Sequence, residues 1–523
     1  MTSRYQHIVI GGGHNGLVCA AYLARAGKSV LVLEAAKEIG GAARTRELAP
    51  GASVSSGAHL LYAMPADLIR DLKLSNHGLT FSAKQIKTLS ISESGNTIAF
   101  DGNTIAGVSL SEEDKVAFGR FSTDMQRFAT VLRPILNKIP PRISIETWSE
   151  RIELLGLGWS LRKLGRFYMR EFLRIIGMNF YDLLDEYYTN EQLKAAIAMD
   201  ALLGSEWAAR SMGSVLTYLC RQAGYSHNGG TGLSLPQGGL GALSQSIASA
   251  AKAAGTEIRT GAKVKRILVE NLNAVGVELE SGEQILADNV ISNADPKQTF
   301  LKLVHVEHLD TGFVRRIRNI RSSGKAGKLH LVLKGAPKFN GVDAAQLGSR
   351  LLIAPSLDEI ELAFNPSKYK EYPKAPVLEI TIPSVSDQSL VKNGQHVLSA
   401  VVQYLPYDDS EQEDANRAAC LDNILNQLER HAPGIKALVV KAELLTPRDI
   451  EREFGMTGGH WHHVELVFES FLFNRPVAAL SRYAGPIGNL YLCGAGSHPG
   501  GNVMGIAGRN AAQQVLESTK GGN

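Results

Sequence analysis

The alternation of apolar and polar stretches at the start of the chain predicts a strand, a helix and a second strand. Residues 7–10 form a short apolar run, residues 15–26 have helical composition, and residues 29–34 return to β-branched residues and leucine. Three glycines, Gly11, Gly13 and Gly16, lie between the first strand and the helix in the spacing G-x-G-x-x-G. We therefore expect a βαβ unit with a glycine-rich turn after its first strand.

This glycine pattern indicates a dinucleotide site. Gly11 allows a tight turn, Gly13 lets the backbone approach a pyrophosphate, and Gly16 lets the helix pack closely on the strand. The N-terminus of the helix directs free N–H groups and a positive dipole at the phosphates. Glu34 follows 18 residues after Gly16, at the end of the second strand, where its carboxylate can bind ribose hydroxyls. Glycine-rich turns alone are common, but here strand, turn, helix, strand and acid occur in order.

The segment after Glu34 favours FAD over NAD. It holds the pair Gly40-Gly41, followed by Arg44 and Thr45. This order resembles the E-x(5)-G-G-x-x-x-T/S continuation of glutathione-reductase-type and amine-oxidase-type FAD proteins. The resemblance implies that the glycines bring a loop against the dinucleotide and that Arg44 contacts its phosphates.

A second glycine-rich segment lies near the other end of the chain. Residues 489–493 are expected to form a strand that ends at Gly494 and Gly496, and a helix is expected to begin near residues 502–505. A turn of this kind favours an anion, and a helix dipole aimed at a flavin ring stabilises its reduced anionic form. The two glycine-rich segments would then hold one cofactor, with substrate-binding segments between them.

Several motifs together resemble the phytoene-desaturase-like flavoproteins, which include bacterial-type carotenoid desaturases, carotenoid isomerases and retinol-saturase relatives. These are the first glycine pattern, Arg44-Thr45-Arg46, and the run 497–501 of sequence SHPGG. Residues 234–296 resemble the middle portion of that family's FAD domain, which implies that the backbone of Val264 meets the adenine. The resemblance covers essentially the whole chain. It is strongest to a branch of uncharacterised pyridine nucleotide-disulfide oxidoreductase domain-containing proteins.

The name of that branch does not fit the sequence literally. A disulfide reductase needs a redox-active cysteine pair and a second nucleotide-binding βαβ unit. The four cysteines (Cys19, Cys220, Cys420 and Cys493) include no C-x-x-C pair, and residues 238–241 do not complete a second glycine pattern. An NAD(P)H-driven reductase is therefore disfavoured.

The resemblance implies an α/β fold with an α+β substrate part. We expect a discontinuous Rossmann-type FAD-binding domain of the glutathione-reductase/amine-oxidase type, with an inserted substrate domain of mixed sheet and helices. The FAD domain would comprise residues 1–70, 225–300 and 475–523, and the substrate domain residues 71–224 and 301–474. Within the latter, strands are expected near residues 328–333, 376–382 and 396–405, and an exposed amphipathic helix at 411–430.

A helical region at 146–200 carries arginines every four residues, interleaved with aromatic and aliphatic residues. The arginines are Arg162, Arg166, Arg170 and Arg174. A helix of this kind can lie on anionic lipid, but it can equally be a solvated surface helix or dock on another subunit of a homo-oligomer. The net charge of +4 is too small for a nucleic-acid partner, and no apolar run is long enough to span a membrane. We expect a cytoplasmic protein, peripheral at the inner face of a membrane if this helix contacts lipid.

Histidines are the candidate catalytic residues. His460, His462 and His463 lie together after two glycines, but no partner at metal-ligand spacing accompanies them, so no metal site is expected. On an extended segment His460 and His462 would share one face and His463 would point away. The resemblance implies that this segment approaches the flavin, with His462 or His463 as donors lining a substrate tunnel. His59 and His498 are further candidates, His498 beside the flavin ring; all four could instead be structural histidines.

We predict an FAD-dependent oxidoreductase that desaturates, saturates or isomerises a hydrophobic polyene or isoprenoid-like compound. Desaturation requires hydride transfer to flavin N5 and removal of a proton from the adjacent carbon, with oxygen or a quinone as final acceptor. A flavin amine oxidase and a binding or scaffold protein that keeps FAD for structure are the alternatives. The residues expected to contact FAD are Gly11, Gly13, His14, Asn15, Gly16, Glu34, Ala35, Gly41, Ala42, Arg44, Thr45, Val264, Gly494, Gly496, Gly501, Asn502 and Val503.

Overall fold

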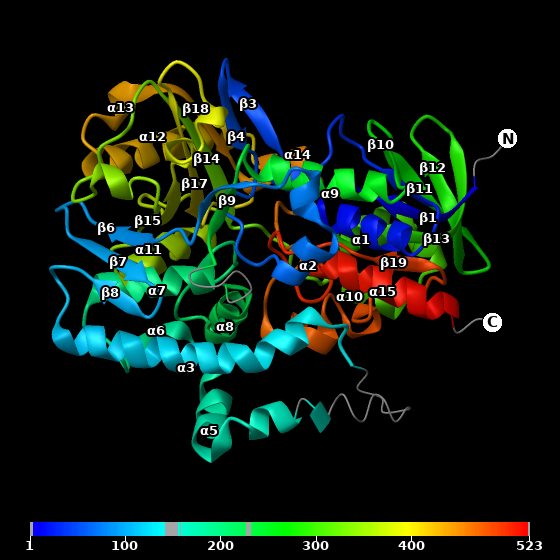
Figure 1. Ribbon diagram of the computed structural model, residues 1–523, viewed down its shortest axis with the longest axis horizontal. Coiled ribbons are helices and arrows are strands. Elements are labelled where there is room, and N and C mark those ends of the chain that lie inside the picture. Colours follow the sequence, from blue (N-terminus) through cyan, green and yellow to red (C-terminus); the bar gives the residue numbers. More distant parts are fainter. Residues whose placement is uncertain (1–3, 142–154, 157, 226–231, 521–523) are drawn as a thin grey trace.

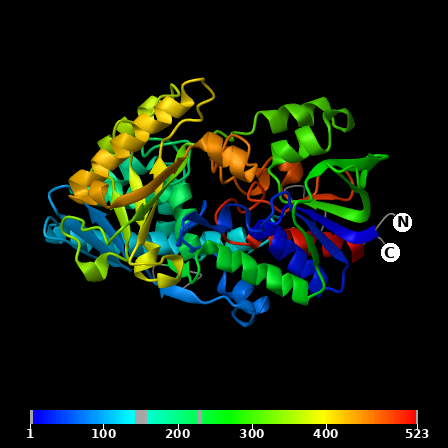
Figure 2. The ribbon, with the colours of Figure 1, turned by 90° about the horizontal axis from the view of Figure 1, so that it is seen from above.

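A computed structural model describes residues 4–141, 155–156, 158–225 and 232–520 of the chain. Two sheets lie side by side, each with its own helices, and a long helix, α3 (Glu112–Asn137), runs along one edge of the molecule (Figure 1). Figure 2 shows the same two parts from above, with both ends of the chain beside the first sheet. No helix among these residues is long and apolar enough to cross a membrane.

The first sheet has seven strands in the order β10-β2-β1-β13-β12-β11, with β19 paired to β13. Strands β1, β2, β10, β13 and β19 are parallel, while β11 and β12 pair antiparallel. The strands are β1 (Arg4–Ile10), β2 (Val30–Leu33), β10 (Glu257–Arg259), β11 (Val264–Glu270), β12 (Asn273–Leu279), β13 (Gln284–Ser292) and β19 (Leu490–Leu492).

Both faces of this sheet are buried, as is usual for parallel strands. On one face Val9 packs with helices α1 (His14–Arg25) and α15 (Ile506–Lys520), and α9 (Leu240–Ala253) packs beside α1. On the other face Ile8 and Ile10 pack with residues of α10 (Thr311–Arg318). The predicted strand–helix–strand order at the start of the chain is confirmed within two or three residues. The last helix begins one residue later than expected, because Asn502 and Gly505 have φ angles of 84° and 72°.

The second sheet has eight strands in the order β18-β14-β17-β16-β15-β6-β7-β8. Its members β14, β16 and β17 coincide with the three strands predicted from the apolar runs. The strands are β6 (Thr88–Ile91), β7 (Thr97–Asp101), β8 (Thr104–Ala106), β14 (Ala326–Leu333), β15 (Arg350–Ile353), β16 (Leu378–Thr381), β17 (His396–Gln403) and β18 (Val439–Leu445). The predicted amphipathic helix is α12 (Glu413–His431), which buries Cys420, Ile424 and Leu428 against this sheet.

A helical layer adjoins the second sheet. It is formed by α3, α6 (Phe180–Asp185), α7 (Glu191–Leu202), α8 (Ser214–Tyr225) and α11 (Leu357–Ser367). Phe121 of α3 is fully buried and contacts the rings of Phe180, Tyr188 and Tyr218, which fastens α3 to α6 and α8. The helix α5 (Gly165–Ile175) lies beyond α3, away from both sheets (Figure 1).

Short elements complete the fold. The hairpin β3 (Thr45–Ala49) and β4 (Ala52–Ser55) is one two-stranded sheet, and β5 (Phe81–Lys84) with β9 (Ser234–Pro236) is another. Further α-helices are α2 (Ala66–Asp71), α13 (Ile435–Leu438) and α14 (Pro447–Phe454). Of the helical region predicted at 146–200, residues 146–154 and 157 lie outside the described residues, as do residues 226–231 of the predicted middle FAD segment.

Candidate active site

The first glycine turn has the backbone geometry that the sequence predicts. Gly11 has a φ of 96°, and a Cβ on Gly16 would lie only 2.2 Å from the carbonyl oxygen of Gly11. Helix α1 begins at His14, and its N-cap residue Gly13 provides no side-chain cap. The first N–H groups of α1 are therefore free to bind an anion.

Glu34 and the following loop close around this turn. The Oε2 atom of Glu34 accepts a hydrogen bond of 2.6 Å from Gly12 N, and Oε1 accepts one of 2.8 Å from Ala36 N. Gly40 N donates to Gly12 O at 2.8 Å, so the loop predicted to approach the dinucleotide lies directly against the glycine turn. The carboxylate is thus held where the second strand ends.

A cavity of about 380 Å³ extends from the glycine turn to the second sheet. It brings together residues from both ends of the chain and from its middle. Predicted residues that line it are Gly11, Gly13, His14, Asn15, Glu34, Ala35, Gly41, Ala42, Arg44, Val264, Asn502 and Val503, together with His59 and His463.

Five predicted FAD residues do not line this cavity. A Cβ on Gly494 or Gly496 would lie 2.6 Å from Asn293 O or 2.7 Å from Pro296 Cδ, so these glycines, like Gly16, serve close packing. Thr45 Oγ1 accepts a hydrogen bond of 3.0 Å from Gly241 N, in the first turn of α9. Gly501 lines a smaller, neighbouring cavity.

The cavity residues fit FAD. The Nε2 atom of His14 and the Oδ1 atom of Asn15 are buried and have no hydrogen-bond partner among the described residues. Burial lowers the pKa of His14 to about 4, so its ring is neutral. Unpaired buried polar atoms beside an uncapped helix N-terminus and a glycine turn point to a bound polar ligand of dinucleotide type.

The wall of the cavity opposite the glycine turn carries ionisable side chains. Among them His59 was predicted from the sequence, whereas Lys328 and Glu379 were not. Lys328 of β14 is fully buried, and its Nζ atom lies 2.5 Å from His59 Nδ1. The Nε2 atom of His59 lies 3.0 Å from Glu379 Oε1, on β16. Burial holds the pKa of Lys328 well below its usual range, with Glu379 opposing this in part. Burial and Lys328 together lower the pKa of His59 to about 4.

Two arginines compensate the carboxylates of this wall. Arg350 Nε bonds Glu379 Oε2, and its Nη2 atom lies 2.7 Å from Asp200 Oδ1. Arg221 lies 3.3 Å from the same oxygen of Asp200 and 3.7 Å from Glu379. Burial raises the pKa of Glu379, but Arg350, His59 and Arg221 outweigh this and lower it overall. Lys328 and Glu379 each interrupt an apolar strand in the sequence, a signal that could have identified them.

The segment with three histidines is a turn rather than extended chain. His463 has a φ of 62°, and its N–H donates to His460 O at 2.8 Å. The expected extended conformation is therefore wrong, although the rings of His460 and His462 do lie together, with centres 5.7 Å apart. His460 Nε2 lies 3.1 Å from Glu465 Oε2, and His462 Nε2 accepts from Trp461 Nε1. His463 lines the larger cavity and His462 the smaller one.

His498 lies apart from the cavity. It is fully buried, and its Nε2 atom lies 3.0 Å from the carbonyl oxygen of Ile135, at the end of α3. It lines neither the larger nor the smaller cavity. The His498 ring is directed towards α3, and its predicted place beside the flavin ring stays a prediction.

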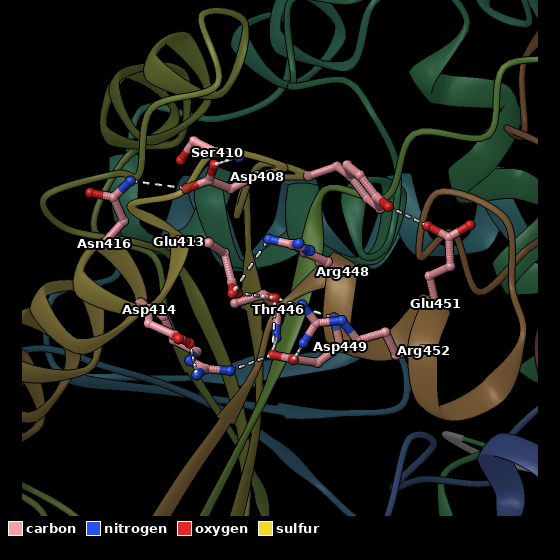
Figure 3. A network of polar contacts seen from close by, with 12 residues as sticks. Asp408, Ser410, Glu413, Asp414, Asn416, Thr446, Arg448, Asp449, Glu451 and Arg452 are labelled. Atoms are coloured by element: carbon pink, nitrogen blue, oxygen red, sulfur yellow. Dashed lines mark hydrogen bonds and ion pairs between the residues drawn. The ribbon is translucent and has the colours of Figure 1, made fainter.

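Helix α14 forms another side of the cavity. Its residue Glu453 bonds Arg44 at 2.5 Å, and the Arg44 guanidinium lies 5.4 Å from the centre of the Phe454 ring. Figure 3 shows how α14 is fixed: Thr446 Oγ1 caps the helix through Asp449 and bonds Glu413 of α12 at 3.1 Å. Arg44, predicted to bind phosphates, is thus paired with a carboxylate at the cavity wall.

Comparison with known proteins agrees with this site. Residues 16–516 match the flavin containing amine oxidoreductase family. The chain is 33% identical to "Pyridine nucleotide-disulfide oxidoreductase domain-containing protein 2" of Rattus norvegicus, covering 99% of this chain and 94% of that one. It is 25% identical to one of the subunits of limonene dehydrogenase from Castellaniella defragrans, over 98% and 94% of the two chains. It is also 25% identical to "Prolycopene isomerase, chloroplastic" of Daucus carota, over 96% and 78%.

These matches agree with the motifs that resemble phytoene-desaturase-like flavoproteins. The α/β fold fits them, as do the residues between 11 and 44 that line the cavity, here called the FAD cradle. The matched family consists of flavin-containing oxidoreductases, so the activity of the chain is that of an oxidoreductase and FAD is its cofactor. The chain therefore belongs to the flavin containing amine oxidoreductase family and is an FAD-dependent oxidoreductase.

Proposed function

We propose that this oxidoreductase desaturates, saturates or isomerises an apolar, isoprenoid-like substrate. One observation carries the proposal: a single cavity joins the FAD cradle to a wall with apolar side chains and a fully buried lysine. The apolar side chains include Leu60, Leu203, Val401, Met456 and Trp461. The printed names of two relatives, a limonene dehydrogenase and a prolycopene isomerase, support a substrate of this class.

Bound FAD would supply the hydride acceptor in this reaction. Removal of a proton from the neighbouring carbon requires a base, and Lys328 Nζ is the group best suited to hold that proton. Its depressed pKa favours the free amine, whose lone pair can accept a proton from substrate. His59 Nδ1 lies 2.5 Å away and can share the proton, while Glu379 holds the ring in place. We propose oxygen or a quinone as the final acceptor of the electrons.

Anaerobic reduction of the bound flavin tests the proposal. The holoprotein is mixed without oxygen with fractions of a lipid extract, and the absorbance of oxidised flavin is followed. We expect one or more apolar fractions to bleach the flavin and to yield a product with a changed number or geometry of double bonds. Bleaching by amines alone would contradict the proposal.

Amine oxidation is the second candidate, favoured by the matched family and by Trp461 at the cavity. An uncharged Lys328 could also take a proton from a substrate ammonium group. Primary and secondary amines added to the same anaerobic protein distinguish the two reactions. If neither class reduces a flavin that dithionite reduces normally, saturation or isomerisation with reduced flavin is tested next, by mixing the dithionite-reduced protein with the apolar fractions. A scaffold that keeps FAD for structure is the conclusion if these fractions are unchanged as well.

We also propose that the region of α5 contacts an anionic lipid surface. Trp159, Phe167 and Leu173 are 59%, 74% and 59% exposed, and Arg166 and Arg170 are exposed beside them. The predicted four-residue repeat does not lie on one helix, because Gly165 has a φ of 77° and α5 begins there. Arg174 is not a free cation, since it bonds Glu171 and Glu186 at 2.6 and 2.8 Å.

Co-sedimentation with vesicles tests this surface. We expect binding to phosphatidylglycerol vesicles that weakens in salt and in the double variant Arg166→Glu/Arg170→Glu, and little binding to phosphatidylcholine vesicles. A salt-independent homo-oligomer that disappears in Phe167→Ser, without vesicle binding, would contradict lipid contact and identify an interface between copies of the chain.

A further inference from the structure

A second, smaller cavity adjoins the larger one. Its volume is about 70 Å³, and the two share Tyr62, Leu203, Arg221 and Asn502 as lining residues. The smaller cavity lies between α3, α8 and the turn at 499–506. A molecule whose reacting carbon is beside FAD and Lys328 can therefore extend into it.

The smaller cavity has an apolar wall. Leu136, Leu216, Leu466, Phe471 and Ile506 line it from four parts of the chain. No ligand is needed to explain these residues individually, since most also pack in the core. Together they provide an apolar passage that continues the larger cavity towards α3.

Arg133 of α3 stands in this passage without a counter-ion in the described part of the chain. Its Nε atom is buried, and neither a hydrogen bond nor an ion pair links its guanidinium to the other described residues. Arg221, by contrast, lies against Asp200 and Glu379. The Oγ1 atom of Thr217, on α8, also lines the cavity and is buried without a hydrogen-bond partner among the residues that the structure describes.

Charge balance indicates what this arrangement binds. In the network behind the cavity, Arg221 and Arg350 face the carboxylates of Asp200 and Glu379. Of the two arginines that line the smaller cavity, Arg221 is paired, whereas Arg133 makes no ion pair with the described residues and is accompanied by the hydroxyl of Thr217. A single guanidinium pairs well with one carboxylate, whereas a diphosphate normally requires several cations.

We propose that the substrate is an isoprenoid-like carboxylic acid whose carboxylate binds Arg133 in the smaller cavity. Its apolar chain extends past Tyr62 and Leu203 into the larger cavity. This inference rests on the proposed function and adds the polar end of the substrate to it. Arg133 acts here as a specificity residue, distant from the proton-handling group at Lys328.

Three probes with one C15 chain test the inference: farnesoic acid, farnesol and farnesylamine. Binding to the holoprotein is measured under anaerobic conditions from the change in the flavin spectrum. We expect the acid to bind at least about tenfold more tightly than the alcohol or the amine, because a charge-assisted hydrogen bond replaces a neutral contact. The Arg133→Gln variant is expected to lose that preference, with alcohol affinity unchanged.

Arg120→Gln is the matched control, because Arg120 lies exposed on the same helix. Flavin content and thermal unfolding show whether each variant is folded. Equal affinity for the three head groups, or an unchanged acid preference in Arg133→Gln, would overturn the inference. If apolar lipid fractions still bleach the flavin in that case, the proposed function stands; if no apolar compound binds or bleaches, both fail.

Discussion

Two walls of the same cavity are built in different ways. The cradle side comes largely from residues 11–44, one continuous stretch in which glycines and a helix N-terminus present the backbone. The opposite side comes from His59, Lys328 and Glu379, which lie far apart in sequence and present side chains. The first wall is made of backbone geometry that recurs in dinucleotide sites. The second wall consists of buried ionisable side chains that shift one another's pKa values. Differences in this wall can give relatives different substrate specificity.

The largest expected effect concerns the cradle. Gly16→Ala places a Cβ about where the carbonyl oxygen of Gly11 already lies, at 2.2 Å. We expect the purified variant to contain almost no FAD, as measured by absorbance after release of the cofactor. Gly177→Ala is the control, since a Cβ there meets nothing within 4 Å. Normal FAD content in Gly16→Ala would show that the turn does not hold the cofactor.

The next effect concerns the charges of the opposite wall. Glu379→Gln removes a buried carboxylate that both Arg350 and Arg221 contact. Removing one partner from a buried ion-pair network destabilises by about 4 kcal/mol, which urea unfolding would measure. The exposed Glu371→Gln is expected to change stability by less than about 0.5 kcal/mol. Equal stability of the two variants would mean that the wall is solvated and not a dry proton-handling site.

The dependence of folding stability on pH should reveal the same difference between the buried side chains of the opposite wall and the cradle. The pKa of buried His59 is about 4 in the folded protein, against an ordinary 6.5. As the pH falls, the unfolded chain takes up this proton first, so stability is lost between about pH 6.5 and 4 and is unaffected above that range. His59 contributes at most about 3 kcal/mol to this loss, so His59→Gln should flatten the dependence on pH. The cradle residue His14 also has a pKa near 4, and bound FAD should change its contribution.

The smallest effect concerns the support of α14. Thr446→Ala removes the hydroxyl that caps this helix and bonds Glu413 (Figure 3). Loss of such a cap costs about 1 kcal/mol. Thermal unfolding should detect this, whereas FAD content should stay normal because Glu453 and Phe454 remain in place. A loss of FAD would place α14 among the cofactor-binding elements.

The sequence predicted the cradle better than the wall for a physical reason. Glycine spacing and strand–helix order are local, so Gly11, Gly13 and Glu34 could be placed before the structure was known. The pairing of β14 with β17 and of β17 with β16 brings Lys328 near Glu379, and no local pattern specifies that pairing. The direction of the His498 ring depends on a contact with α3, and the turn in the histidine segment depends on the positive φ of His463; no local sequence pattern specifies either.

Reduction of the bound flavin by an apolar substrate tests the account most directly. The rate is measured anaerobically in the wild-type protein, in Lys328→Met and in the exposed control Lys334→Met. We expect Lys328→Met to keep its FAD and to lose at least about 100-fold in rate, the usual contribution of a positioned base, while Lys334→Met stays normal. An unchanged rate in Lys328→Met, with FAD bound and an apolar compound as reductant, would contradict the assignment of this wall as the site of proton removal.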